Sequence, residues 1–191
     1  GLTNDEARAL AREGKAIVHI DGGVHSTEVA TAQHTMQLAY DLLTGTDDRE
    51  IQTILDNVIF MLWPTLNPDG QNMVAAWYQS NVGTPYEIAP LTALYQKYVG
   101  HDNNRDAYML NMIESRVIAR TLQHWEPQIV YTQHQSSPFP TRIWLPPFAE
   151  PIGLRVHPLM SRTVNTIGML MAQGLEERGQ IGATHMGTGY D

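Results

Sequence analysis

The sequence contains no cysteine, few basic residues and no long apolar run. Without cysteine the chain has no disulfides and no thiolate metal ligands. Its cysteine content therefore does not indicate whether the protein belongs to an oxidising or a reducing compartment. With 12 Lys and Arg against 20 Asp and Glu, its formal net charge of −8 would repel a phosphate backbone or an anionic membrane surface. No apolar run reaches the length of about 20 residues that a transmembrane helix needs. We therefore expect neither a nucleic-acid partner nor a membrane span.

The remaining composition is that of an ordinary globular domain. Of the 191 residues, 42% are hydrophobic and 17% charged, which disfavours a disordered or fibrous chain. This length is enough for one domain with its own core. Because the chain begins with Gly1 rather than Met, we expect it to be a trimmed or partial product.

Apolar strands and amphipathic helices alternate along the chain. Three strands are predicted from buried apolar runs, within "KAIVHIDGG" from Lys15, "NVIFMLW" from Asn57 and "QIVYTQH" from Gln128. Apolar residues at three- and four-residue steps predict three helices, from Val29 to near Gly45, from about Ala107 to His124, and from about Pro158 to Glu177.

The segments between these elements are predicted as turns and loops. Ser26 or Thr27 is expected to cap the first helix. Asn67 to Gly70, "NPDG", has the composition of a turn. Residues 71–105 show no clean periodicity, so we expect a long functional loop there. A Pro-rich loop is expected over residues 136–151.

This alternation predicts an α/β fold with a mixed, mostly parallel sheet and helices on both faces. In such sheets, ligands bind beyond the carboxyl ends of the strands. His25 and Glu28 follow the first predicted strand, and His134 ends the third. These three side chains are therefore expected at the same edge of the sheet.

His25, Glu28 and His134 have the chemistry of a zinc site. A catalytic zinc ion takes three protein ligands and leaves one position open, and imidazole nitrogen with carboxylate oxygen suits it. The spacing of His25 and Glu28 alone is weak evidence, because such a pair arises often by chance. A solvated turn with an acidic residue at a helix start, and a hydrogen-bonded histidine at a strand end, explain the same residues without a metal.

Four segments resemble the zinc carboxypeptidase family, of the carboxypeptidase A-like type. In order they are "GGVHSTE", "LNPDG", "GHDNNRD" and "VYTQH", and they fall between about Lys15 and His134. In that family an HxxE segment, an NPDG turn, a DxNR segment and a strand-end His follow one another at similar spacings. The resemblance implies a zinc-peptidase-like fold in which Zn²⁺ is bound by His25, Glu28 and His134.

The resemblance also assigns roles around the metal. Asp102 would accept a hydrogen bond from His25, which fixes the ring and raises its basicity. Asn104 and Arg105 would hold the terminal carboxylate of the substrate, which the planar guanidinium matches well. The implied reaction is zinc-dependent hydrolysis of C-terminal peptide bonds, with peptide or protein C-termini as substrates and a secreted or periplasmic location.

Two features depart from the family. Its members carry an Arg after the NPDG turn that polarises the scissile carbonyl, but residues 71–90 contain none. Its general-base Glu lies on a late strand, expected here beyond residue 191, so no catalytic residue is assigned within the chain. We therefore expect residues 1–191 to be a single, incomplete metallocarboxypeptidase-like catalytic domain that lacks N- and C-terminal parts.

Two other functions fit the same residues. Zinc-dependent deacylases of N-acyl amino acids share HxxE, an Asn-Arg pair and a late His, although the "NPDG" segment favours the peptidase. A noncatalytic peptide binder built on the zinc scaffold is the other alternative, supported by the missing loop Arg and general base.

Overall fold

The computed structural model describes residues 1–96, 98–135, 141–148 and 153–185. The chain divides into two compact units, Gly1–Gln135 and Ser136–Asp191. Among the described residues, no helix is both long and apolar enough to cross a membrane. All three strands and every candidate site residue identified from the sequence lie in the first unit.

The first unit is built on a parallel sheet of three strands. β1 (Ala16–Asp21) is central and pairs with β2 (Val58–Trp63) on one side and with β3 (Ile129–Thr132) on the other. The register aligns the strand ends, since Asp21 pairs with both Trp63 and Thr132. The three predicted strands and their parallel arrangement are confirmed, and all three carboxyl ends meet at one edge.

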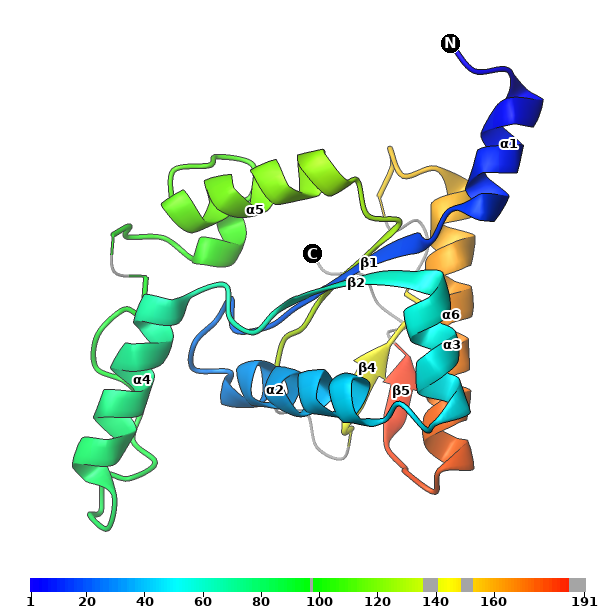
Figure 1. Ribbon diagram of the computed structural model, residues 1–191. Helices are drawn as coiled ribbons and strands as arrows, with labels where there is room; N and C mark the ends of the chain where they lie inside the picture. The colour runs from blue at the N-terminus through cyan, green and yellow to red at the C-terminus, as the bar shows by residue number, and fades with distance from the viewer. Residues whose placement is uncertain (97, 136–140, 149–152, 186–191) are drawn as a thin grey trace. The chain divides into compact units, whose positions relative to one another are not determined.

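Helices connect these strands and cover the sheet. Because β2 and β3 lie on opposite sides of β1, right-handed crossovers place α2 and α5 on opposite faces, as Figure 1 shows. The mixed α/β fold is thus confirmed. The helical elements of the first unit are α1 (Asn4–Glu13), α2 (Val29–Thr44), α3 (Arg49–Asn57), α4 (Pro68–Asn81), the 3₁₀ turn η1 (Asn103–Arg105) and α5 (Ile113–Trp125).

The predicted cap of α2 is wrong, although the helix itself has the predicted extent. Glu28 occupies the N-cap position without a capping bond from its own side chain, and the Ala30 N–H in the first turn donates instead to Oε1 of Gln135 at 3.1 Å. The Ser26 hydroxyl instead donates to the carbonyl of Asn67 at 3.2 Å. This hydroxyl therefore joins the loops that follow β1 and β2.

The "NPDG" segment begins a helix rather than a simple turn. The Asn67 side chain accepts a hydrogen bond from the Gly70 N–H at 2.9 Å, and Pro68 occupies the first turn of α4. The first part of the long loop predicted over residues 71–105 is therefore helical. Sequence periodicity missed α4 because its apolar residues cluster at 73–78 instead of recurring on one face.

Three further differences concern helices of the first unit. α5 begins at Ile113 instead of Ala107, because the preceding residues form turns. α1 and α3 were not predicted, and neither contains a buried residue. Local capping stabilises both: Thr3 and Glu6 form a capping box, and Asp48 accepts hydrogen bonds from the first turn of α3.

The second unit contains a parallel pair of short strands and one long helix. β4 (Ile143–Leu145) pairs with β5 (Ala183–His185), and α6 (Pro158–Glu177) has the predicted bounds. The predicted Pro-rich loop thus contains a strand, while residues 136–140 and 149–151 of that loop lie outside the described residues.

Close packing between β1 and α2 depends on Gly22. A Cβ at this position would overlap the backbone carbonyl of Thr31, in the first turn of α2. We predict that Gly22→Ala lowers the free energy of unfolding by about 1–3 kcal/mol, because backbone atoms have little room to move. Urea denaturation measures the change. Gly100→Ala is the matched control, since a Cβ there meets nothing within 4 Å, and an equal loss in both variants would contradict this packing.

Candidate metal centre

Hydrogen bonds to two other segments fix the backbone of the loop after β1. The Gly22 carbonyl accepts from the Leu66 N–H at 2.9 Å, and the Gly23 N–H donates to the Thr31 hydroxyl at 3.0 Å. Gly23 has a φ of 69°, a left-handed conformation that glycine adopts most readily. The chain thereby turns sharply out of β1 and brings His25 and Glu28 to the edge where β3 ends.

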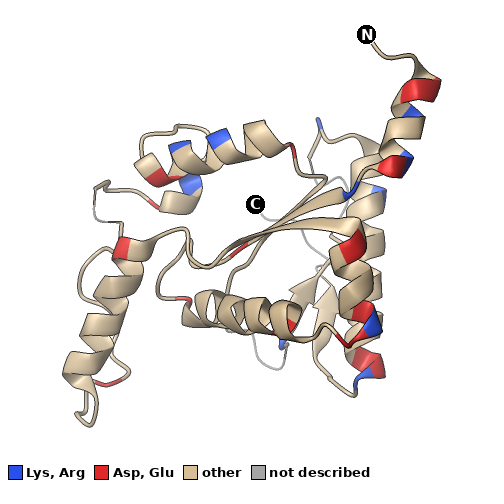
Figure 2. Ribbon diagram, in the orientation of Figure 1, with Lys and Arg blue, Asp and Glu red and all other residues tan. Residues whose placement is uncertain are grey.

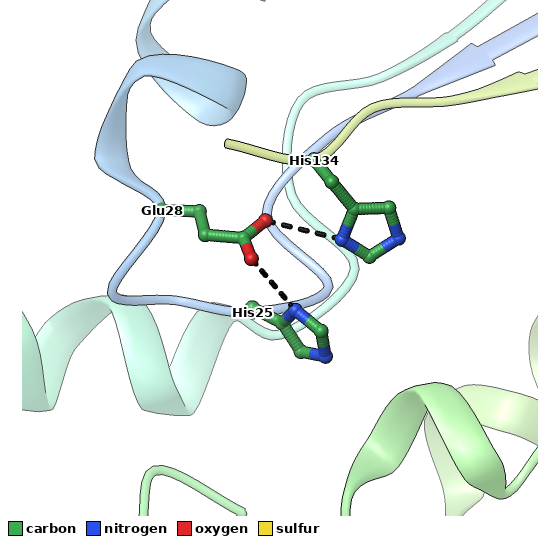
Figure 3. Close-up of side chains that lie close together, drawn as sticks. All are labelled: His25, Glu28 and His134. Atoms are coloured by element: carbon green, nitrogen blue, oxygen red, sulfur yellow. Dashed lines mark hydrogen bonds and ion pairs between the residues drawn. The ribbon is translucent and has the colours of Figure 1, made fainter. Parts of the chain in front are cut away.

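His25, Glu28 and His134 form a compact cluster at this edge (Figure 3). The Glu28 carboxylate lies between the two rings, with Oε1 accepting from Nδ1 of His25 at 2.9 Å and Oε2 accepting from Nδ1 of His134 at 3.1 Å. One potential ligand atom from each residue lies within 4.8 Å of the others. The side chains of His25 and Glu28 are 17% and 19% exposed, and that of His134 is 37% exposed, so solvent reaches the cluster.

The donor set of this cluster fits zinc. Two imidazole nitrogens and a carboxylate oxygen converge, which is the ligand set of many catalytic zinc sites. In both rings the nitrogen directed at Glu28 is Nδ1, which leaves Nε2 for other partners. The structure thus brings together the three ligands that the sequence suggested, and their role as ligands stays a prediction.

Asp102 contacts the outer nitrogen of His25. Its Oδ1 accepts a hydrogen bond from Nε2 of His25 at 2.9 Å and another from the Asn104 N–H at 2.8 Å. Burial raises the pKa of Asp102, but the bonds from Asn104 and His25 outweigh it, so the pKa lies below its usual value. An ionised carboxylate behind a metal-binding ring orients the ring, as the resemblance implies for this residue.

The turn that carries Asp102 also carries Asn104 and Arg105. Nδ2 of Asn104 lies 3.4 Å from Nε2 of His134, and Arg105 is exposed. Between them, the buried Asn103 side chain donates to the Val24 carbonyl, which ties the turn to the loop after β1. Of the two predicted substrate-binding residues, Asn104 therefore lies next to a predicted metal ligand, and Arg105 follows it in the same turn.

Sequence reasoning missed two residues near the cluster. The Gln135 N–H donates to Oε2 of Glu28 at 2.9 Å, so the residue after His134 also helps to orient the carboxylate. The Tyr95 ring lies 6.3 Å from that of His25, between ring centroids. Burial and the negative charges of Asp102 and Glu28 raise the pKa of Tyr95, which keeps its phenol protonated. In the sequence, the only sign that Gln135 belongs to the site is its position next to His134. No sequence pattern identifies Tyr95.

A buried pair lies on the sheet near the same edge. Nε2 of His19 contacts Oδ2 of Asp21 at 2.9 Å, and the Thr132 hydroxyl donates to the same oxygen at 3.1 Å. Burial raises the pKa of Asp21 more than His19 and Thr132 lower it. The bond from Thr132 to Asp21 joins β3 to β1.

A family comparison agrees with this geometry. The family model described as zinc carboxypeptidase matches residues 2–139, which include the cluster and the turn from Asp102 to Arg105. The chain belongs to the zinc carboxypeptidase family. No match was found among curated protein sequences. Members of this family are zinc-dependent hydrolases, and the donor set at the sheet edge suits that metal.

Removing one histidine tests the ligand assignment. We predict that His25→Ala and His134→Ala each reduce bound zinc well below the one ion per chain expected of the unsubstituted carboxypeptidase-family protein, because only two ligands remain. Elemental analysis after dialysis measures the stoichiometry, and circular dichroism checks folding. His124→Ala, at the end of α5, is the matched control. A folded His134→Ala protein with one zinc per chain would show that the assignment is wrong.

The residue that follows the turn, Asp106, makes stability sensitive to acid. Burial would raise its pKa, but hydrogen bonds from Met112, Ser115, His101 and Asn111 lower it to about 2. In the unfolded chain an Asp has a pKa of about 3.9, so the folded state gains stability above that pH and loses it as the pH falls toward 2.

We predict that the unfolding free energy of the unsubstituted protein falls between about pH 5 and pH 2, and that part of this slope disappears in Asp106→Asn. Denaturant titrations at several pH values measure it. Equal slopes in both proteins would contradict the low pKa of Asp106.

Proposed function

We propose that this protein is a zinc-dependent carboxypeptidase that removes residues from the C-termini of peptides or proteins. The observation that supports this most is the position of the Asp102–Arg105 turn. Asp102 bonds to one predicted metal ligand, Asn104 lies beside another, and the exposed Arg105 follows directly. A carboxylate-binding group next to a metal centre selects the last peptide bond of a substrate.

Each candidate site residue has a distinct role in this proposal. His25, Glu28 and His134 would hold zinc, and a zinc ion bound there would supply Lewis-acid chemistry for the hydrolysis of a peptide bond. Asp102 keeps the His25 ring oriented through its Nε2. The Arg105 guanidinium, with the Asn104 amide, would bind the free carboxylate of the substrate through charge-assisted hydrogen bonds.

We assign no general base among the residues that the structure describes. Glu28 already accepts hydrogen bonds from both rings, and Asp102 is bound to His25 and to the backbone of Asn104. Neither carboxylate is therefore placed to take a proton from water. A secreted or periplasmic location remains part of the proposal.

Substitution of Arg105 tests the carboxylate-binding role. We predict that Arg105→Met in the full-length protein raises KM at least tenfold for a blocked dipeptide with a free C-terminus and leaves cleavage of its amidated analogue unchanged, because a charge-assisted contact is lost. Arg120→Met, on exposed α5, is the matched control.

Steady-state kinetics with the free and amidated peptides, and with an N-acetyl amino acid, distinguish the candidate functions. Turnover of the N-acetyl amino acid alone would identify a deacylase. Binding without turnover of any substrate would identify a peptide binder.

A further inference from the structure

We propose that Asp106 is a positioning residue that fixes the Asp102–Arg105 turn against the metal centre. The inference rests on the proposed carboxypeptidase function for its kinetic consequences, but its structural basis is independent of that function. Asp106 touches none of the cluster residues in the described contacts. It acts through the turn that precedes it in the chain.

The Asp106 carboxylate is fully buried and surrounded by donors. Its side chain is 0% exposed. Oδ1 accepts from Nε2 of His101 at 2.9 Å and from the Asn111 N–H at 3.3 Å, and Oδ2 accepts from the Met112 N–H at 2.8 Å. The Ser115 side chain adds a further hydrogen bond. A buried carboxylate with this many donors is held in one position.

The bond between His101 and Asp106 closes the functional turn. His101 directly precedes Asp102, and Asp106 directly follows Arg105, so a side-chain contact joins the two ends of the segment. Inside the closed segment, the Asp106 N–H donates to the Asn103 carbonyl at 3.0 Å. The segment is therefore restrained at both ends as well as at Asn103.

The opposite side of Asp106 fixes where the closed segment lies. Its carbonyl accepts from Leu110 at 2.8 Å, and its carboxylate holds the backbone of Met112, the residue before α5. Because α5 leads directly to β3, this contact relates the turn to the strand that immediately precedes His134. Asp106 thus links the predicted substrate-binding residues to the element that supplies a predicted metal ligand.

A simpler role for Asp106 predicts different behaviour. If its carboxylate only satisfied the N–H groups that precede α5, its loss would loosen the start of that helix and leave the turn unchanged. If it positions the turn, amide exchange at Asn104 and Arg105 should quicken, because the acceptors of both N–H groups belong to Asp102 within the closed segment.

The test compares four variants of the full-length, zinc-loaded protein. Asp106→Asn removes the charge and places an amide among donors, His101→Leu removes the closing contact, and His101→Gln keeps a donor at that position. Asp48→Asn is the matched control, because Asp48 is also a carboxylate that accepts backbone N–H bonds, at the start of α3. Hydrogen exchange, zinc stoichiometry and kinetics on free and amidated peptides are measured for each.

We expect Asp106→Asn and His101→Leu to speed amide exchange at Asn104 and Arg105 by about tenfold or more. We also expect them to raise KM for the free peptide by about tenfold with kcat changed less than about twofold. In His101→Gln, amide exchange at the turn and the KM for the free peptide should return most of the way to the values of the unsubstituted protein. Asp48→Asn should change neither the exchange at the turn nor this KM. Zinc should stay at one ion per chain in all four variants.

The proposal would be overturned if amide exchange quickened only at the start of α5, while exchange at Asn104 and Arg105 and the KM for the free peptide stayed unchanged. If Asp106→Asn does not fold, the two His101 variants decide the question. Equal amide exchange at the turn and equal KM in His101→Leu and His101→Gln would also overturn the proposal. If the unsubstituted protein does not hydrolyse either peptide, the proposed function fails, and amide exchange still decides the role of Asp106.

Discussion

The site depends on the hydrogen bonds that the Glu28 carboxylate accepts from two histidines. The two oxygens of Glu28 accept hydrogen bonds from His25, three residues before it, and from His134, 106 residues after it. This geometry requires the ends of β1 and β3 to meet, which the parallel pairing of those strands provides. A local segment thus supplies two of the three predicted metal ligands, and the residues that follow β3 supply the third.

Figure 2 marks the Asp and Glu residues of the protein in red. Burial and hydrogen bonding act in different proportions on the charge of three of them, Asp21, Asp102 and Asp106. Asp102 and Asp106 receive enough hydrogen bonds to keep their pKa values low, whereas burial dominates at Asp21 and raises its pKa. The ionised groups are those that orient His25 and the turn. The group with the raised pKa lies within the sheet, where a charge is least favourable.

The loops around the site are fixed mainly by contacts between loops. The Ser26 hydroxyl bonds to Asn67, the Asn103 amide bonds to Val24, and Asp106 bonds to His101. Each contact joins or closes a segment outside the regular helices and strands. The contacts of Asn103 and Asp106 hold the Asp102–Arg105 turn near the predicted metal ligands, and the contact of Ser26 joins the loops that follow β1 and β2.

Continuous apolar runs and helical periodicity are local signals, so the sequence alone was enough to predict the three parallel strands and the extents of α2 and α6. It also singled out His25, Glu28 and His134 as candidate zinc ligands. It did not predict α4, whose apolar residues cluster, or α1 and α3, whose starts are stabilised by caps without buried residues. The partner of Ser26, the position of Tyr95 and the closure of the turn by Asp106 became apparent from the folded structure alone. These depend on contacts between residues brought together by folding, which no spacing in the sequence records.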